Sequence, residues 1–498
     1  MPDDTPVVVI GAGIGGLVAA IELAVAGYPV RIFEAAETVG GKARLQYVDG
    51  HAVNAGPTVF TLPDIFEDTL ARAGTSLADE IELRQAEVLA RHAWVDGSRL
   101  DLFADTERSI EAIAAFAGSD EAAGFRRFRA DAERARALLE GPFLRAAEPS
   151  TWRLVRSHGP SALAQLARIN PYASLWTALG RYFRDPRLRQ LFGRYATYTG
   201  ADPFRASASL MLIADVEQRG VWQVDGGMHA LAEMLADVAR RWGVSIECNT
   251  PVATIDCDDH DRVVGLRLAD TRHVATRRVI SNVDTHALTE GRFGAAARRS
   301  LDNRRRMPAL SGVTWCVVAR TDGFPLSHHN VFFGNDYAAE FTDLFDRRRL
   351  PADPTVYVCA QDRPATEHAT APPDTERLLC LANAPGTGAD GLGPTDDAHD
   401  AFQERVFGVL RRAGLRITSR VTPVSTGPGD FARRFPGSRG ALYGPPAHGA
   451  RAPFARPTAR SRLAGLYLAG GDVHPGAGLP MVALSGQNAA HALMADEG

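Results

Sequence analysis

Apolar residues at the start of the chain alternate between short β-branched runs and one longer helical run. Val7–Ile10 predicts a strand, residues 17–26 predict a helix that ends at Gly27, and Val30–Phe33 predicts a second strand. This order is typical of a βαβ unit, in which a crossover helix joins two parallel strands.

Strands of the same short, β-branched type return in the middle and at the end of the chain. The pattern predicts strands at residues 244–248, 263–268, 278–280 and 465–469, and a C-terminal helix at residues 479–494. The simplest architecture that explains this spacing is one α/β domain built from discontinuous segments.

Two long stretches interrupt that domain. Residues 75–220 are largely helical in pattern, most clearly at 105–140, whereas residues 285–415 look mixed. We therefore expect two interleaved domains. The first comprises residues 1–75, 220–285 and 415–498, and the second, an α+β domain, comprises residues 76–219 and 286–414.

Composition and charge exclude several function classes. The 498 residues carry a net charge of −4, which does not favour nucleic-acid binding. The five cysteines include no C-x-x-C pair, which argues against a zinc ribbon or a disulfide scaffold and favours a reducing compartment. No window offers the ~20 apolar residues of a bilayer span, and the acidic start is unlike a secretory signal. We expect a soluble or peripheral protein without a metal site.

The turn after the first strand is rich in glycine and matches G-x-G-x-x-G at Gly11, Gly13 and Gly16. The first glycine permits a tight turn, the second lets a pyrophosphate approach the backbone, and the third allows close packing of helix and strand. Glu34 ends the second strand, where a carboxylate accepts hydrogen bonds from ribose hydroxyls and repels a 2′-phosphate. This combination predicts a dinucleotide site rather than a bare glycine-rich turn.

The segment after Glu34 indicates which dinucleotide binds. Gly41, Lys42 and Arg44 belong to the sequence GGKAR, which resembles the extension that FAD-binding oxidoreductases carry after the first βαβ unit. Lys42 is the only lysine among the 55 lysine and arginine residues, and we therefore hypothesise that its side chain faces a phosphate of the cofactor. Alternatively, both basic side chains point to water.

A second half of the FAD site is predicted near the C-terminus. The last strand runs into Gly471 and Asp472, and a helix then begins near Met481. In FAD proteins of this type the acid binds a ribityl hydroxyl, and backbone N–H groups at the helix start stabilise negative charge on the reduced flavin. A plain Gly-Gly-Asp turn is the alternative.

Several segments together resemble the carotenoid desaturases (phytoene-desaturase type) of the FAD amine-oxidase superfamily. They include residues 54–58 (NAGPT), residues 226–228 (GGM) and, most specifically, residues 474–480 (HPGAGLP). Residues 471–474 look most like the hydroxycarotenoid 3,4-desaturase branch, because phytoene desaturases usually have glycine where Asp472 stands. The resemblance implies a Rossmann-type, glutathione-reductase-like FAD domain. It also places the Val252 backbone at adenine and, beside the flavin, the residues Gly56, Pro57 and Thr58.

By this resemblance, the expected reaction is desaturation of a lipid-soluble carotenoid by hydride transfer to flavin N5, with quinone or oxygen as the final electron acceptor. His474 is the one titratable residue that we expect near the flavin, as an acid/base or orienting group, although a structural His-Pro turn explains it equally well. Asp225 and His229 are weaker candidates. Alternatives are phytoene or neurosporene desaturation, a soluble amine oxidase, which the single lysine disfavours, and a carotenoid-binding flavoprotein without activity.

Residues 151–206 combine nine arginines with nine aromatic residues and only two acids. Basic and interfacial aromatic side chains suit docking to a membrane, where a carotenoid is dissolved. We therefore expect a helical, membrane-facing part and a cytoplasmic protein peripheral to the inner or intracytoplasmic membrane. An ordinary helical subdomain, with its aromatics in the core and its arginines in water, is the alternative.

Overall fold

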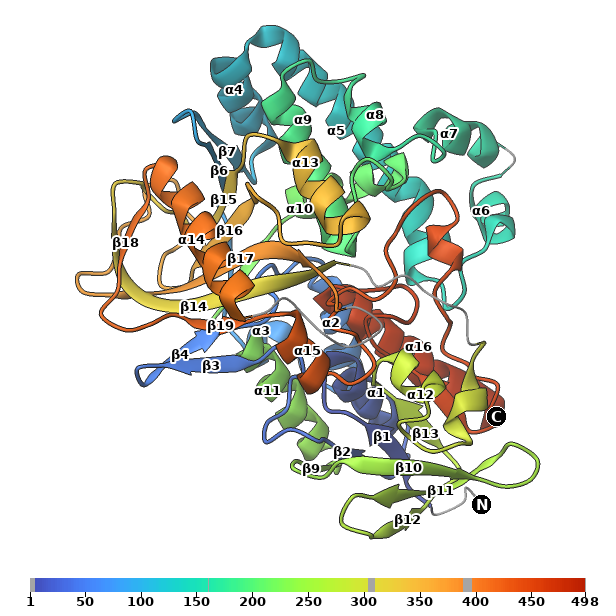
Figure 1. Ribbon diagram of the computed structural model, residues 1–498. Coiled ribbons are helices and arrows are strands. Elements are labelled where there is room, and N and C mark those ends of the chain that lie inside the picture. Colours follow the sequence, from blue (N-terminus) through green and yellow to red (C-terminus); the bar gives the residue numbers. More distant parts are fainter. Residues whose placement is uncertain (1–4, 160, 303–309, 388–395, 498) are drawn as a thin grey trace.

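The computed structural model describes residues 5–159, 161–302, 310–387 and 396–497 (Figure 1). The βαβ unit is present as β1 (Val7–Ile10), α1 (Ile14–Val25) and β2 (Val30–Phe33). It belongs to a five-stranded parallel sheet, ordered β20-β13-β1-β2-β9, that also contains β9 (Ser245–Glu247), β13 (Val279–Ser281) and β20 (Leu466–Leu468). All residues of β1 are buried, as its continuous apolar run requires in a sheet covered on both faces.

Two helices pack against α1 and close one face of this sheet. They are α11 (Met228–Arg241) and the C-terminal helix α16 (Leu479–Glu497), so segments from three distant parts of the chain meet there. The contact is close at its glycines, since a Cβ at Gly486 would lie 2.2 Å from the carbonyl oxygen of Gly15. The expectation of a discontinuous α/β unit is thereby confirmed.

One predicted strand belongs to a different sheet. Residues 263–268 form β11 (Val263–Leu268), which pairs antiparallel with β10 (Val252–Cys257) and β12 (His273–Ala275). The predicted strand is present, and tertiary pairing, which local propensity does not determine, places it in this three-stranded antiparallel sheet.

The largest sheet is mixed and has eight strands. Its order is β18-β14-β17-β16-β15-β6-β7, with β19 paired to β14. Only the β15–β6 pair is parallel, and α14 (Asp396–Arg412) covers one face. The strands are β6 (Val88–Trp94), β7 (Arg99–Phe103), β14 (Leu310–Asp322), β15 (His329–Phe333), β16 (Val356–Ala360), β17 (Glu376–Pro385), β18 (Arg416–Thr418) and β19 (Val424–Thr426).

Residues 75–220 are largely helical, as the pattern predicts, but they also contain strands β6 and β7. Their antiparallel pairing joins them to the mixed sheet, where the central residues are buried between sheet and helices. Most of the rest of that stretch is helical, and residues 105–140 form two helices, α4 (Thr106–Ala117) and α5 (Ser119–Leu139). They are separated at Gly118, whose φ of +98° does not continue a helix.

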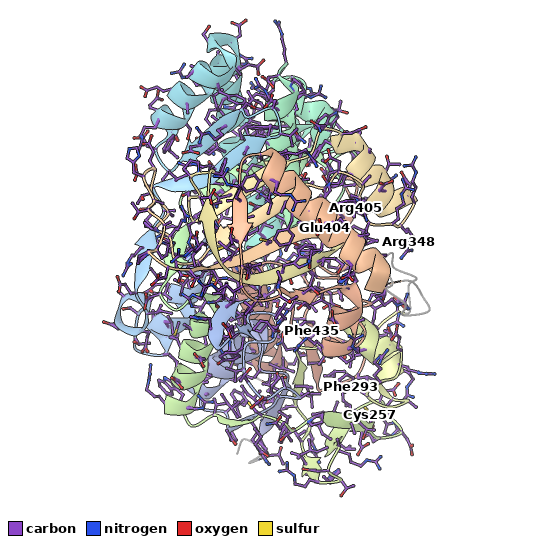
Figure 2. All side chains as sticks on the ribbon, turned by 60° about the vertical axis from the view of Figure 1, so that its left-hand side comes forward. Cys257, Phe293, Arg348, Glu404, Arg405 and Phe435 are labelled. Atoms are coloured by element: carbon purple, nitrogen blue, oxygen red, sulfur yellow. The ribbon has the colours of Figure 1, made fainter. Side chains whose placement is uncertain are left out.

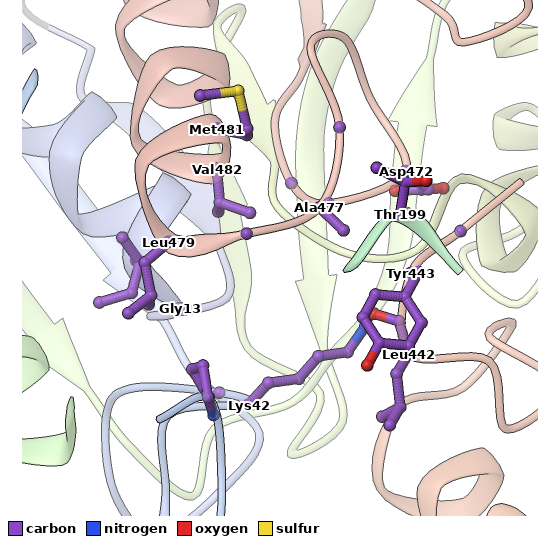
Figure 3. Close-up of a pocket in the computed structure, with 18 of the residues that line it drawn as sticks. Gly13, Lys42, Thr199, Leu442, Tyr443, Asp472, Ala477, Leu479, Met481 and Val482 are labelled. Carbon is purple, nitrogen blue, oxygen red and sulfur yellow. The ribbon is translucent and has the colours of Figure 1, made fainter. Parts of the chain in front are cut away.

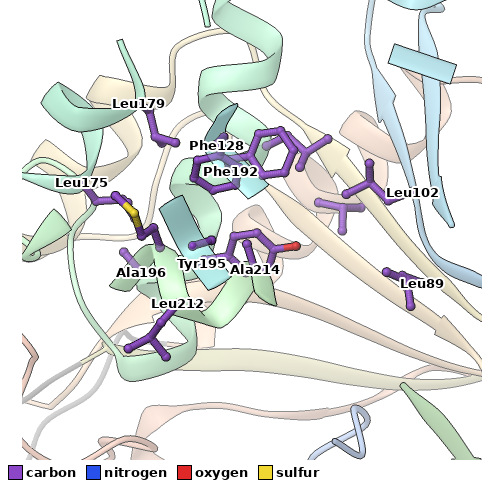
Figure 4. Close-up of a cluster of buried hydrophobic side chains, with 14 of the residues drawn as sticks. Leu89, Leu102, Phe128, Leu175, Leu179, Phe192, Tyr195, Ala196, Leu212 and Ala214 are labelled. Carbon is purple, nitrogen blue, oxygen red and sulfur yellow. The ribbon is translucent and has the colours of Figure 1, made fainter. Parts of the chain in front are cut away.

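The helical layer above the mixed sheet has an aromatic core. Phe128, Phe192 and Tyr195 pack among leucines in this cluster (Figure 4), and the Phe128 and Phe192 rings lie 4.9 Å apart. The shorter helices are α2 (Asp64–Arg72), α3 (Leu77–Glu80), α6 (Thr151–His158), α7 (Ser161–Ile169), α8 (Leu175–Leu179), α9 (Pro186–Gly193), α10 (Leu212–Gln218), α12 (Thr285–Thr289), α13 (Tyr337–Phe341) and α15 (Pro428–Arg434). Strands β3 (Leu45–Val48) and β4 (His51–Asn54) form a hairpin. Strands β5 (Leu83–Gln85) and β8 (Trp222–Val224), which are far apart in the sequence, form a second two-stranded sheet.

Figure 2 shows how the side chains fill the space between these layers. Glu404 and Arg405 mark α14 on the mixed sheet, Cys257 and Phe293 mark the region of the three-stranded sheet, and Phe435 lies between them. Within the described ranges, no helix is both long and apolar enough to cross a bilayer.

Candidate functional site

A cavity of about 1860 Å³ lies where the two large sheets and the helical layer meet. This volume exceeds that of an ordinary small-molecule pocket, roughly 300–1,000 Å³, and suits two ligands or one very long ligand. Of the site residues expected from the sequence, all line it except Gly16 and the weaker candidate Asp225. These lining residues are Gly11, Gly13, Glu34, Gly41, Lys42, Arg44, Gly56, Pro57, Thr58, His229, Val252, Gly471, Asp472, His474 and Met481.

The glycine turn forms one end of the cavity. Gly11 has a φ of +95°, which glycine adopts without strain, and Gly13 precedes the first turn of α1. Gly16 lies behind the turn, where a Cβ would come within 2.2 Å of the Gly11 carbonyl oxygen. The start of α1 therefore packs tightly against β1, and its unpaired N–H groups suit an anionic ligand such as a pyrophosphate.

Glu34 is buried at the end of β2, next to this turn. Its carboxylate accepts hydrogen bonds from the backbone N–H groups of Ala12 at 2.7 Å and Ala36 at 2.8 Å. The N–H of Thr250 donates to the Glu34 carbonyl at 2.8 Å, which brings Val252 to the same end of the cavity. A carboxylate oriented by two backbone donors fits a diol ligand such as ribose and does not fit a 2′-phosphate.

Lys42 points into the cavity and not to solvent (Figure 3). Its Nζ donates a hydrogen bond to the Leu442 carbonyl at 3.0 Å. Burial lowers the pKa of Lys42, while the carboxylates of Asp284 and Asp472 act in the opposite direction. Lys42 therefore lies in the cavity on the side of these two acids.

Arg44 turns away from the glycine turn toward the mixed sheet. Its Nη2 donates to Thr426 Oγ1 at 3.2 Å, in strand β19. Burial lowers the pKa of this guanidinium. Gly56 packs under the same loop, because a Cβ there would lie 2.1 Å from the Lys42 carbonyl oxygen.

Asp472 closes the other side of the cavity, near the start of α16. Its Oδ2 accepts hydrogen bonds from the N–H of Thr285 at 2.7 Å and from the Thr285 hydroxyl at 2.5 Å. Burial raises the pKa of Asp472, and the nearby charge of Asp284 raises it further. Met481 lies in the first turn of α16 (Figure 3), where backbone N–H groups are available to an electronegative atom.

His474 lies in the loop between β20 and α16. Its Nε2 is 2.9 Å from the Ala146 carbonyl, so this nitrogen carries the proton, and burial lowers the pKa of the ring. A neutral imidazole that binds a backbone carbonyl orients the loop, and its acid/base role stays a prediction. Of the weaker candidates, Asp225 is exposed, whereas His229 is buried with Nδ1 3.0 Å from the Ala43 carbonyl.

Two clusters resemble metal sites in composition. His328, His329 and Cys359 have possible ligand atoms within 4.8 Å of one another, as do Asp284, His286 and Asp472. In the first cluster, Nδ1 of His329 lies 2.7 Å from the Tyr357 hydroxyl, and Sγ of Cys359 lies 3.6 Å from Nε2 of His328, so these side chains are already paired. Asp472 already accepts two hydrogen bonds from Thr285. We assign a metal to neither cluster.

The arm of the cavity that leads away from the glycine turn is mostly apolar. It passes Ile213 and Val216 on α10 and Phe143, and reaches Leu166 on α7 and the exposed Tyr172. Of the nine aromatic residues in 151–206, only Trp152 and Tyr172 are exposed, at 71% and 88%. The other seven pack in or against two hydrophobic clusters, one of them the aromatic core, as the ordinary helical alternative requires.

This arm also contains a group of polar side chains that the sequence did not indicate. Arg194, Tyr198, Glu217 and Tyr357 line the cavity, and Tyr357 donates a hydrogen bond to Thr58 Oγ1 at 2.7 Å. Arg194 is one of the nine arginines that the sequence suggested for membrane docking, yet it faces the interior. No sequence signal separated it from the others, because only the tertiary fold turns this helix end inward.

Comparison with known proteins agrees with this geometry. Hydroxyneurosporene desaturase of Rubrivivax gelatinosus is 47% identical over 98% of this chain and 93% of its own. Hydroxyneurosporene desaturase of Cereibacter sphaeroides is 43% identical over 98% and 97%. The fold is similar to that of cyclohexylamine oxidase from Brevibacterium oxydans, with a TM-score of 0.57, 16% identity and coverage of 99% and 100%. Residues 14–494 match the model of the flavin-containing amine oxidoreductases, and the chain belongs to this family.

Proposed function

We propose that this protein is an FAD-dependent carotenoid desaturase. Its reaction is the introduction of the C3,4 double bond into 1-hydroxy- or 1-methoxycarotenoids. The observation that carries the proposal is the full-length similarity to hydroxyneurosporene desaturases, which extends through both ends of the cavity. A cavity this large accommodates a dinucleotide together with part of a long polyene.

In this proposal, FAD occupies the end of the cavity beside the parallel sheet, in a Rossmann-type domain of residues 1–75, 220–285 and 415–498. Gly11, Gly13 and the start of α1 hold the pyrophosphate, and Glu34 binds the adenosine ribose. Asp472 would accept a hydrogen bond from the ribityl chain, and the backbone N–H groups in the first turn of α16 would stabilise negative charge on the reduced flavin. The substrate domain of residues 76–219 and 286–414 then supplies the apolar arm. Strands β18 and β19, which come from the last segment of the chain, complete the mixed sheet.

Bound FAD supplies a two-electron acceptor for a hydride. The chain itself holds the polyene in the apolar arm, excludes water with its aromatic and aliphatic walls, and aligns the allylic carbon with the cofactor. Because a polyene cation is delocalised, loss of the second proton needs only a weak base. His474 is neutral and lines the cavity, so it suits this or an orienting role.

We infer that the carotenoid enters from a membrane surface at α6 and α7. Trp152, Arg153 and Arg156 are exposed on α6, and Tyr172 follows α7 at the end of the apolar arm. Interfacial aromatics beside basic residues favour binding to anionic headgroups. The location that follows is cytoplasmic and peripheral to the inner or intracytoplasmic membrane, where quinone or oxygen is available as electron acceptor.

Pigment colour in a carotenoid-producing host tests the proposal. Expression in cells that make neurosporene or its 1-hydroxy derivatives should shift the carotenoid absorption to the red, because each new double bond lengthens the conjugated system. A shift with neurosporene but not with its hydroxy derivatives would favour the phytoene/neurosporene alternative. If the absorption does not shift although the purified protein contains flavin, the protein is not a desaturase, and the alternative of a carotenoid-binding flavoprotein without activity is favoured.

A further inference from the structure

A compact polar group interrupts the apolar wall of the cavity. Arg194 and Tyr198 come from the 3-10 segment after α9, Glu217 from α10, and Tyr357 from β16 in the mixed sheet. Buried polar side chains in an apolar arm lower stability unless they are paired, so each partner matters.

Most of this group is satisfied within the protein. The hydroxyl groups of Tyr195 and Tyr198 donate to the carboxylate of Glu217 at 2.7 and 2.6 Å. The Tyr357 hydroxyl donates to Thr58 and lies 2.7 Å from Nδ1 of His329. These side chains therefore have little remaining capacity for a ligand.

Arg194 is different. A guanidinium has five N–H donors, and in the described part of the chain Arg194 makes one hydrogen bond, to the Tyr198 hydroxyl at 3.1 Å. Its central carbon lies 5.3 and 5.6 Å from the ring centroids of Tyr198 and Tyr357, so two aromatic rings hold it at the cavity wall. Burial disfavours the charge, but Tyr198 and Glu217 raise the pKa of Arg194, and it stays a cation. Its remaining donors await an acceptor.

We propose that Arg194 binds the oxygen substituent at the end of the carotenoid. This inference rests on the proposed function and names the residue that selects the substrate class. Hydroxyl and methoxy oxygens both accept hydrogen bonds, so a side chain that only donates suits both end groups.

The position of Arg194 is consistent with the site of reaction. An oxygen on C1 is three bonds from C3, so its binding partner must lie close to the reacting bond. Thr58, which we place beside the flavin, is hydrogen-bonded to Tyr357, and the Tyr357 ring contacts Arg194. A hydrocarbon end group would leave the buried donors unpaired and would be discriminated against.

Two carotenoids with the same polyene, one with a tertiary hydroxyl at C1 and one without, provide the test. We expect the purified holoenzyme to prefer the hydroxylated carotenoid by roughly 100-fold or more in kcat/KM, because the carotenoid without the hydroxyl leaves buried donors unpaired. Arg194→Met should remove this preference through loss of activity on the hydroxylated carotenoid alone, with unchanged flavin content. Arg194→Lys should restore part of it. Arg189→Met is the matched control, because Arg189 stacks on Trp176 in the same helical layer and does not line the cavity.

Several outcomes would overturn the inference. If Arg194→Met loses activity equally on both carotenoids, the role of Arg194 is structural. If the preference of Arg194→Met is unchanged, another group binds the oxygen substituent. If the wild type converts neither carotenoid, the proposed function fails, and equilibrium binding of the two carotenoids, followed by quenching of tryptophan fluorescence, then decides about Arg194. Equal affinities of the wild type for both would refute its role.

Discussion

At the scale of single residues, the cavity combines charges that the fold has oriented before any ligand binds. Glu34 is held by two backbone donors, Asp472 by Thr285, and Lys42 by the Leu442 carbonyl. Pre-oriented groups bind a ligand at a smaller entropy cost. These residues are therefore the places where a single substitution should act on cofactor binding.

Glu34→Ala should weaken FAD binding by roughly 10-fold or more, because it removes the carboxylate that would hold the ribose diol. Glu34→Gln is the matched variant, since its amide oxygen still accepts from the backbone at Ala12. The ratio of flavin to protein absorbance after purification measures occupancy. Full occupancy in both variants would contradict the role of Glu34.

His92 should make stability depend on pH. Burial in the mixed sheet lowers its pKa to about 3, and Nδ1 lies 3.2 Å from the Leu100 carbonyl. The folded state therefore needs a neutral ring, whereas the unfolded chain takes up a proton below pH ~6.5. Its contribution to stability is complete above pH ~6.5 and is lost as the pH falls toward the folded pKa. When the pH is lowered from ~6.5 toward 3, the free energy of unfolding measured by urea titration should fall less in His92→Leu than in the wild type, because leucine does not titrate.

At the scale of secondary-structure elements, glycine contacts decide how closely helices approach. Gly16 in α1 touches the β1–α1 turn, and Gly486 in α16 touches Gly15, so two helices and a strand share one tightly packed line. The exposed pair α6 and α7, by contrast, lies at the periphery (Figure 1) and presents aromatic and basic residues outward. The glycine contacts of α1 and α16 set the shape of the proposed dinucleotide site. Helices α6 and α7 form the surface that we propose docks to a membrane.

Gly16→Ala should destabilise the protein by about 1–3 kcal/mol and reduce flavin content, because its methyl group overlaps the Gly11 carbonyl. Gly141→Ala is the control for a general glycine effect, since a Cβ there meets nothing within 4 Å. Chemical denaturation of both variants measures the difference. Equal stabilities would show that the turn relaxes to accept the methyl group.

Trp152→Ser combined with Tyr172→Ser should reduce pelleting with anionic liposomes severalfold, because both rings would leave the interface. Trp242→Ser is the control, as Trp242 is also exposed but follows α11. Arg153→Gln with Arg156→Gln should weaken pelleting only when anionic lipid is present. Arg187 and Arg189 are less suitable, because they already contact Asp185 and Trp176. Unaltered pelleting of the aromatic variant would exclude docking through α6 and α7.

At the scale of the whole molecule, one cavity collects residues from nearly the full length of the chain. Gly11 and Met481 face the same space, although 470 positions separate them. A ligand that contacts both ends binds only the folded state and stabilises it by mass action.

Removal of FAD should therefore lower the Tm, and added FAD should raise it in a concentration-dependent way. A hundredfold excess over Kd corresponds to about 2.7 kcal/mol. Glu34→Ala should need more FAD for the same shift. A Tm that does not respond to FAD would contradict binding across the interleaved segments.

The sequence by itself determined the βαβ unit, the glycine turn, the C-terminal helix and the family, because these depend on local propensity and on motifs of adjacent residues. It did not determine that residues 263–268 leave the parallel sheet, that β6 and β7 extend the mixed sheet, or that Arg44 and Arg194 point where they do. Those features depend on pairing and burial between segments far apart in the chain. Only the tertiary structure decides which arginine of a basic region faces water and which faces the cavity.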